Sequence, residues 1–122
     1  MPIKKEKIEK KLEEVQKDLI ALQQNVNQEI STLNNKIANQ VFLVNKAAGK
    51  IEALEENYKE LGFTDKEKDE KIETYQHIVQ HGQETLQSIQ QEVDNARSKG
   101  IADAQKLEGK REMYTELLDL SD

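Results

Sequence analysis

The residues whose spacing comes closest to a metal site are His77 and His81, the two histidines of the chain. Four residues apart on a helix, they share one face with Glu73 and Glu84, and such a pair can hold a metal ion. That face points away from the apolar stripe described below, and neither a third histidine nor a cysteine completes the ligand set. We therefore expect no metal site and no cofactor.

Carboxylates are abundant, but a catalytic pair needs a pocket that moves the pKa values of the two acids apart. Two helices side by side enclose no such pocket. The sequence contains no glycine-rich phosphate loop, no nucleophile elbow and no cysteine. These observations predict a protein that is not an enzyme and has no small-molecule substrate.

The charge pattern limits the classes of partner. The net charge is −6 and the two signs are interleaved, whereas a nucleic-acid-binding protein needs a basic surface to neutralise phosphates. No apolar run is long enough to cross a bilayer, and the first residues contain no apolar core of a signal peptide. The sequence therefore predicts a cytoplasmic protein that binds no nucleic acid and does not insert into a membrane.

Apolar residues recur at steps of three and four through both halves of the chain, which indicates two amphipathic helices. Their composition, rich in Glu, Lys, Leu and Ala, is typical of long helices and coiled coils. We call the apolar stripe that the two helices share the seam. Its first-half members include Leu12, Val15, Leu19, Leu22, Val26, Ile30, Leu33, Ile37, Val41, Val44, Ala47 or Ala48, Ile51 and Leu54. Its second-half members include Ile72, Tyr75, Val79, Gly82, Leu86, Ile89, Val93, Ala96, Ala104, Leu107, Arg111 and Tyr114.

One turn signal separates the halves. Gly62 is suited to the left-handed conformation that ends a helix, and Thr64 with Glu67 forms a capping box for the next helix. The fold class is thus all-α, a long antiparallel helical hairpin that resembles a coiled coil. We expect a single domain over residues 1–122, with helices over about residues 3–61 and 65–120 and a turn over about residues 62–64.

Centring the turn near Phe63 predicts which residues face each other. Val44 then lies opposite Gly82 and Val26 lies near Gly100, so that a large residue meets a small one at each level. The same register brings the basic first residues, Lys4 to Lys11, beside the acidic last residues, Glu112 to Asp122. Arg111 at a seam position is more typical of a cation that reaches solvent at the edge of the stripe than of a buried polar layer.

An alternative hypothesis breaks the second helix at Lys99 and Gly100 and folds the last twenty or so residues back as a third helix. One glycine inside a helix costs only about 1 kcal/mol relative to alanine. Because the apolar pattern resumes after Gly100 and no proline stops the helix, we expect the second helix to continue.

A second, shorter apolar stripe lies on the back of the first helix. Phe42 projects away from the seam, whereas Val41, Val44, Ala48 and Ile51 are expected to point into it. Because a two-helix ribbon buries each helix on one side only, such ribbons gain stability as four-helix bundles. The sequence therefore predicts a non-catalytic structural or assembly protein that self-associates, as a dimer or a larger oligomer. The alternative is an adaptor, chaperone or inhibitor that binds a helix of another protein through the same stripe. The predicted partner-binding residues are Ala38, Phe42, Gly49 and Ala53.

Overall fold

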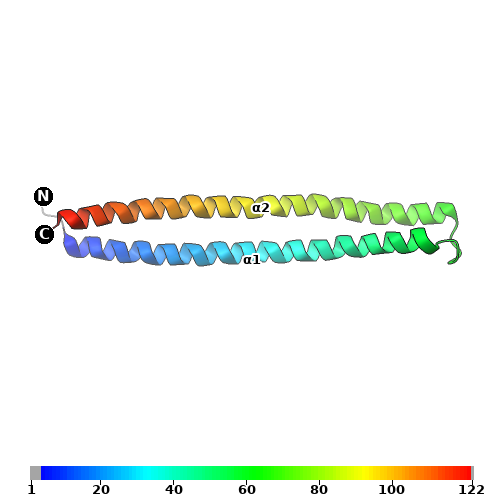
Figure 1. Ribbon diagram of the computed structural model, residues 1–122, viewed down its shortest axis with the longest axis horizontal. Coiled ribbons are helices and arrows are strands. Elements are labelled where there is room, and N and C mark those ends of the chain that lie inside the picture. Colours follow the sequence, from blue (N-terminus) through cyan, green and yellow to red (C-terminus); the bar gives the residue numbers. More distant parts are fainter. Residues whose placement is uncertain (1–3, 122) are drawn as a thin grey trace. The chain divides into compact units, whose positions relative to one another are not determined.

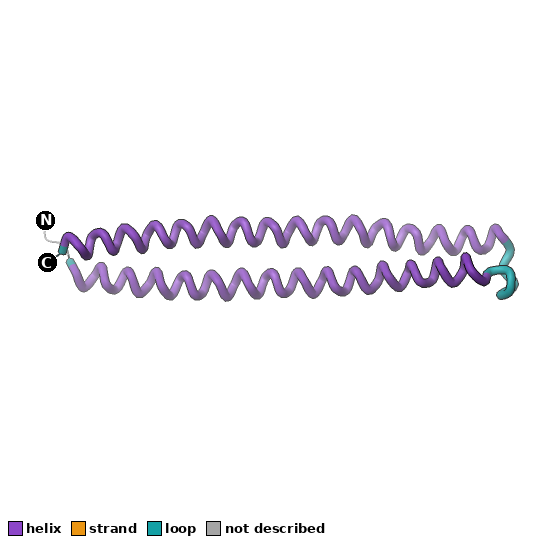
Figure 2. Tube along the Cα trace, in the orientation of Figure 1, coloured by secondary structure: helices purple, strands orange, loops and turns teal. Residues whose placement is uncertain are grey.

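The computed structural model describes residues 4–121 and shows an all-α fold of two long helices packed against each other as a hairpin (Figures 1 and 2). Helix α1 spans Lys5–Asn57 and helix α2 spans Asp65–Leu120. The expected helix start near residue 3 and the acidic Asp122 lie outside the described residues. Helix α2 continues through Gly100, so the three-helix alternative is wrong.

Helix α1 is closed by a turn in which Gly62 has the left-handed φ of 85°. The N–H of Phe63 donates to the carbonyl of Tyr58 at 2.9 Å, and the N–H of Gly62 donates to the carbonyl of Lys59 at 3.1 Å. These two bonds form a Schellman motif, which satisfies carbonyls that the end of a helix leaves without partners. The role expected for Gly62 is confirmed, and regular helix ends at Asn57, four residues before the expected boundary.

Helix α2 begins with the expected capping box. The N–H of Glu67 donates to Thr64 Oγ1 at 3.2 Å, and the N–H of Thr64 donates to Glu67 Oε1, also at 3.2 Å. Each side chain therefore satisfies a backbone donor that the first turn of a helix leaves unpaired. Asp65 and Glu67 add negative charge where the helix dipole is positive.

Replacing Thr64 by alanine is expected to lower the free energy of unfolding by about 1 kcal/mol, because the N–H of Glu67 loses its acceptor. The matched control is Thr74→Ala, inside α2, where the hydroxyl donates only to the carbonyl of Glu70. That change should cost nothing, since alanine is the better helix former. Urea unfolding followed by circular dichroism measures both variants. Equal effects at the two positions would contradict a stabilising role for the cap.

The chain divides into two compact units, each with its own buried apolar residues. The turn unit comprises residues 32–93, and its buried apolar side chains are Leu33, Ala47, Ile72, Ile89 and Val93. The open-end unit comprises residues 4–31 and 94–121 among those described, and its buried apolar side chains are Ile8, Val15 and Ala96. In each unit a segment of α1 lies beside a segment of α2 (Figure 1).

Each unit contains a valine that packs against a glycine of the facing helix. In the turn unit, a Cβ added at Gly82 would overlap Val44 Cγ2. In the open-end unit, a Cβ added at Gly100 would lie 3.0 Å from Val26 Cγ2. Both contacts are those that the antiparallel register predicts, and both are confirmed. The two glycines are needed because a side chain there would occupy the space that the valine fills.

Candidate functional site

The four residues predicted to bind a partner share one exposed face of α1 in the turn unit. Ala38, Phe42, Gly49 and Ala53 are all exposed, and we call them the Phe42 patch. The Phe42 side chain has 63% of its surface accessible, and a Cβ at Gly49 would have no atom within 4 Å. The face therefore has a protruding aromatic ring. Ala38 lies one turn before it along the helix, and Gly49 and Ala53 lie two and three turns after it.

The stretch around Phe42 carries no charge from Ile37 to Asn45, although it includes the polar residues Asn39, Gln40 and Asn45. Leu43 adds a half-exposed apolar side chain beside the ring. One turn further on, Lys46 Nζ lies 5.5 Å from the centroid of the Phe42 ring, within the range of a cation–π contact. The ring therefore lies in a stretch without charge from Ile37 to Asn45, and the ammonium of Lys46, the first charge beyond that stretch, lies over the ring.

The position of Val41 differs from the expectation. Its side chain was expected in the seam, yet 40% of its surface is accessible. Gln40 and Val44 are the residues nearest to Gly82, where a Cβ would lie 3.7 Å from Gln40 Oε1. Because these two side chains, one turn apart, face α2 at this level, Val41 turns towards solvent and adds to the apolar surface near Phe42. Of the two candidates for the next seam level, Ala47 is the buried one and Ala48 is half-buried.

One of the two histidines, His77, lies beside an acid at the surface. His77 Nε2 lies 3.8 Å from Glu73 Oε1, and about three quarters of each side chain is exposed. This contact is charged only when His77 is protonated. Within residues 4–121, no group of three or more His, Cys, Asp or Glu side chains is arranged to hold a metal ion. The arrangement can therefore supply a weak surface contact, of the kind that contributes at most about 1 kcal/mol.

Arg111 also lies at the surface. Its guanidinium nitrogen Nη2 lies 2.8 Å from Glu108 Oε2, one turn earlier on α2, and half of the Arg111 side chain is exposed. The cation therefore reaches solvent beside the seam, as the sequence pattern predicts, and pairs with an acid of its own helix.

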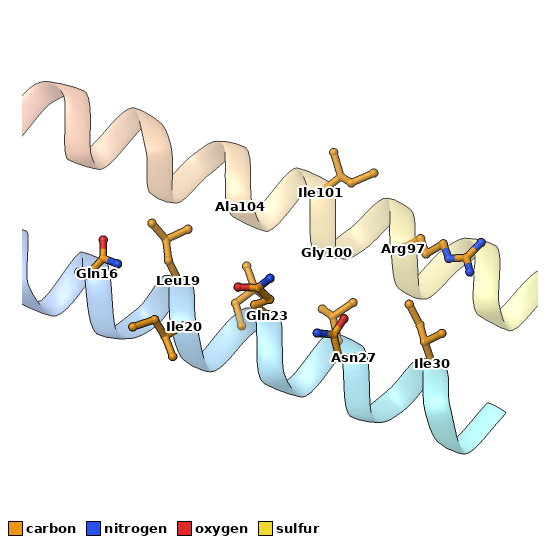
Figure 3. A pocket seen from close by; sticks show the side chains of 12 residues that line it. Gln16, Leu19, Ile20, Gln23, Asn27, Ile30, Arg97, Gly100, Ile101 and Ala104 are labelled. Atoms are coloured by element: carbon orange, nitrogen blue, oxygen red, sulfur yellow. The ribbon is translucent and has the colours of Figure 1, made fainter. Parts of the chain in front are cut away.

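A second apolar surface lies in the open-end unit, and the sequence pattern did not predict it. It is a groove of about 490 Å³ between residues 16–30 of α1 and residues 97–104 of α2 (Figure 3). Gly100 and Ala104 form its α2 side, and Leu19 and Ile30 point into it from α1. Arg97 is the one charged residue among those that line it. We call this surface the Gly100 groove.

The margins of the Gly100 groove carry two exposed isoleucines. Ile20 is 48% accessible and Ile101 is 60% accessible. Each directly follows a seam residue, Leu19 or Gly100, and so lies about 100° round the helix from the seam. An apolar residue directly after a seam residue, as at Ile20 and Ile101, is the sequence feature that could have predicted this surface. At Gly100 itself the space of a side chain is filled, because an added Cβ would lie 3.0 Å from Val26 Cγ2 and the residue is buried.

Neither described helix is apolar enough over the required length to span a membrane. Comparison of the chain with protein-family models, with characterised proteins and with solved structures finds no match.

Proposed function

We propose that this chain is a non-catalytic structural or assembly protein that acts through helix–helix self-association. The observation that carries the proposal is its accessible surface of 9370 Å². A compact monomer of its mass, 14.0 kDa, exposes about 6,700 Å². The excess is roughly 2,700 Å², while a standard protein interface removes about 800 Å² from each partner. The chain thus has enough surplus surface for more than one interface.

The Phe42 patch is the part of the turn unit best suited to this contact. Interface centres are poor in charge and rich in aromatic residues. Phe42 supplies an exposed aromatic ring, and the stretch from Ile37 to Asn45 around it carries no charge. Gly49 and Ala53 leave space for a second helix to approach closely, because neither projects beyond a Cβ. The partner helix would complete a four-helix bundle with the two helices of the hairpin. A cysteine-free chain of this kind suits the reducing cytoplasm, where we place the function.

The proposal is tested by measuring the mass in solution by light scattering at several concentrations. The wild-type chain is expected at about 28 kDa or above, and Phe42→Glu is expected at the monomer mass of 14.0 kDa. A carboxylate at position 42 would replace the ring with a charge that loses its water in the interface, and this desolvation opposes association even with Lys46 one turn away. The matched control is Leu61→Glu, because Leu61 is equally exposed, lies in the same unit and is outside the patch.

A wild-type mass of 14.0 kDa at every concentration would reject self-association. The Phe42 patch would then suit the alternative function, in which an adaptor, chaperone or inhibitor completes its bundle with a helix of another protein. A loss of association in Leu61→Glu as large as that in Phe42→Glu would show that added charge, and not the patch, controls the mass.

A further inference from the structure

The four residues of the Phe42 patch have a spacing that is the same in both chain directions. Ala38 and Phe42 are four residues apart, Phe42 and Gly49 are seven apart, and Gly49 and Ala53 are again four apart. The centre of the series falls between residues 45 and 46. If a second α1 runs antiparallel across that centre, Phe42 of each copy comes level with Gly49 of the other. Ala38 then comes level with Ala53.

The space at Gly49 is open to such a partner. A Cβ added there would meet no other atom of the described residues within 4 Å, and 63% of the Phe42 surface is accessible. The seam shows how helices of this chain use a glycine, because the space of a side chain at Gly82 is filled by Val44 of the facing helix. On the opposite face of α1, a projecting side chain and an unfilled glycine are both present, one for each half of the same kind of contact.

We infer that two copies of this chain associate through antiparallel α1 helices, with a two-fold axis between residues 45 and 46 and with Phe42 of each copy packed over Gly49 of the other. This inference rests on the proposed self-association and specifies the direction and the register of its contact. Because a two-fold axis brings the same surface of both copies together, one ring and one glycine per chain give two ring-over-glycine contacts.

The residues of the patch also lie at nearly the same angle around α1. At 100° per residue, Gly49, Ala53 and Ala38 lie within about 40° of the direction of Phe42. Lys46 lies next to the axis, and its ammonium is held over the ring of its own Phe42, 5.5 Å from the ring centroid. This contact draws the charge towards residue 42 and away from the axis, so the ammonium groups of the two copies are not brought together there.

The charges of α1 around the patch favour a second copy in this direction. Residues 36–56 carry three basic and three acidic side chains, so two copies of this segment meet without net repulsion. The acids all lie in the last part of the segment, and an antiparallel partner places beside them the part that begins with Lys36. A parallel partner would instead gather the carboxylates of both copies at one end, where like charges repel. The basic members are Lys36, Lys46 and Lys50, and the acidic members are Glu52, Glu55 and Glu56.

Cross-linking of single-cysteine variants tests the direction and the register, because the natural chain has no cysteine. Ala38→Cys and Ala53→Cys are treated with a short bifunctional maleimide, each alone and as an equimolar mixture, at a concentration where the wild-type chain associates. The mixture should give a covalent dimer of about 28 kDa. Each variant alone is the control and should stay unlinked, because its two copies would lie about 22 Å apart along the helices.

A second pair, Asn35→Cys with Glu56→Cys, tests the same register at exposed positions outside the patch. These two positions are equally far from the axis, so they too should link only as a mixture. Linking in either mixture beyond that of its separate variants supports the inference.

Linking of Ala38→Cys alone as strongly as in its mixture would indicate a parallel contact or random collision, and either result overturns the inference. If the wild-type chain associates by light scattering while neither mixture links, the antiparallel register is wrong and the proposed self-association stands. A wild-type chain that stays monomeric at every concentration would overturn the proposed function together with the inference.

Discussion

Replacing Val93 by aspartate is expected to unfold the chain or to lower its free energy of unfolding by more than about 4 kcal/mol. Among residues 4–121, Val93 has the most deeply buried side chain, with 1% of its surface accessible. A carboxylate at this position would lose its water and gain no partner, and that cost is among the largest that one substitution can cause. Small domains are stable by only about 5–15 kcal/mol, so the loss removes much of the total.

The measurement is urea unfolding followed by circular dichroism, at one fixed protein concentration because association adds to the apparent stability. The matched control is Gln91→Asp, which introduces the same carboxylate two residues earlier on an exposed part of α2. This control should change the unfolding free energy by no more than about 0.5 kcal/mol. A Val93→Asp variant as stable as the Gln91→Asp variant would show that Val93 is not in a buried seam.

Gly82→Ala is the second substitution with a large expected effect. Alanine in a helix is favoured over glycine by about 1 kcal/mol, so this change would stabilise an open position. At Gly82, however, the new Cβ would overlap Val44 Cγ2. Overpacking of this kind costs about 1–3 kcal/mol, and we expect the overlap to outweigh the gain in helix propensity and to separate the two helices locally.

Two further variants make this expectation specific. Val44→Ala removes the methyl group that overlaps the new Cβ. The loss of unfolding free energy in the double variant, Val44→Ala with Gly82→Ala, should therefore be smaller than the sum of the losses in the two single variants. Gly49→Ala is the matched control, because nothing lies within 4 Å of its added Cβ, and the hairpin should gain about 1 kcal/mol. If Gly82→Ala stabilises the chain as much as Gly49→Ala does, the valine–glycine contact does not set the spacing of the helices.

Gly49→Ala also connects stability with the proposed function. The added methyl group should stabilise the hairpin, but it would stand between the Phe42 patch and a closely packed partner helix. Stability at low concentration and association at high concentration are therefore expected to change in opposite directions for this one variant.

The Phe42 patch and the Gly100 groove differ in shape. The Phe42 patch presents one projecting ring on α1, whereas the Gly100 groove joins residues of both helices around a recess.

The sequence by itself determined the helices, the turn and the level at which residues face each other. Periodic apolar residues, the left-handed Gly62 and the Thr64–Glu67 capping box act within a few residues of the chain, so their effects are visible without the fold. Counting outward from that one turn was then enough to match Val44 with Gly82 and Val26 with Gly100. The exposed position of Phe42 followed from the same helical periodicity.

Only the tertiary structure decided how each helix is rotated against its neighbour. Val41 is exposed because Gln40 and Val44 occupy the level of Gly82, and periodicity alone could not choose between these adjacent positions. Likewise, the Gly100 groove is lined by residues of both helices, Leu19 and Val26 on α1 and Gly100 and Ala104 on α2. A hollow of this kind depends on atoms from two helical segments that lie about seventy residues apart in sequence. Packing between segments so far apart leaves no periodic signal in either helix.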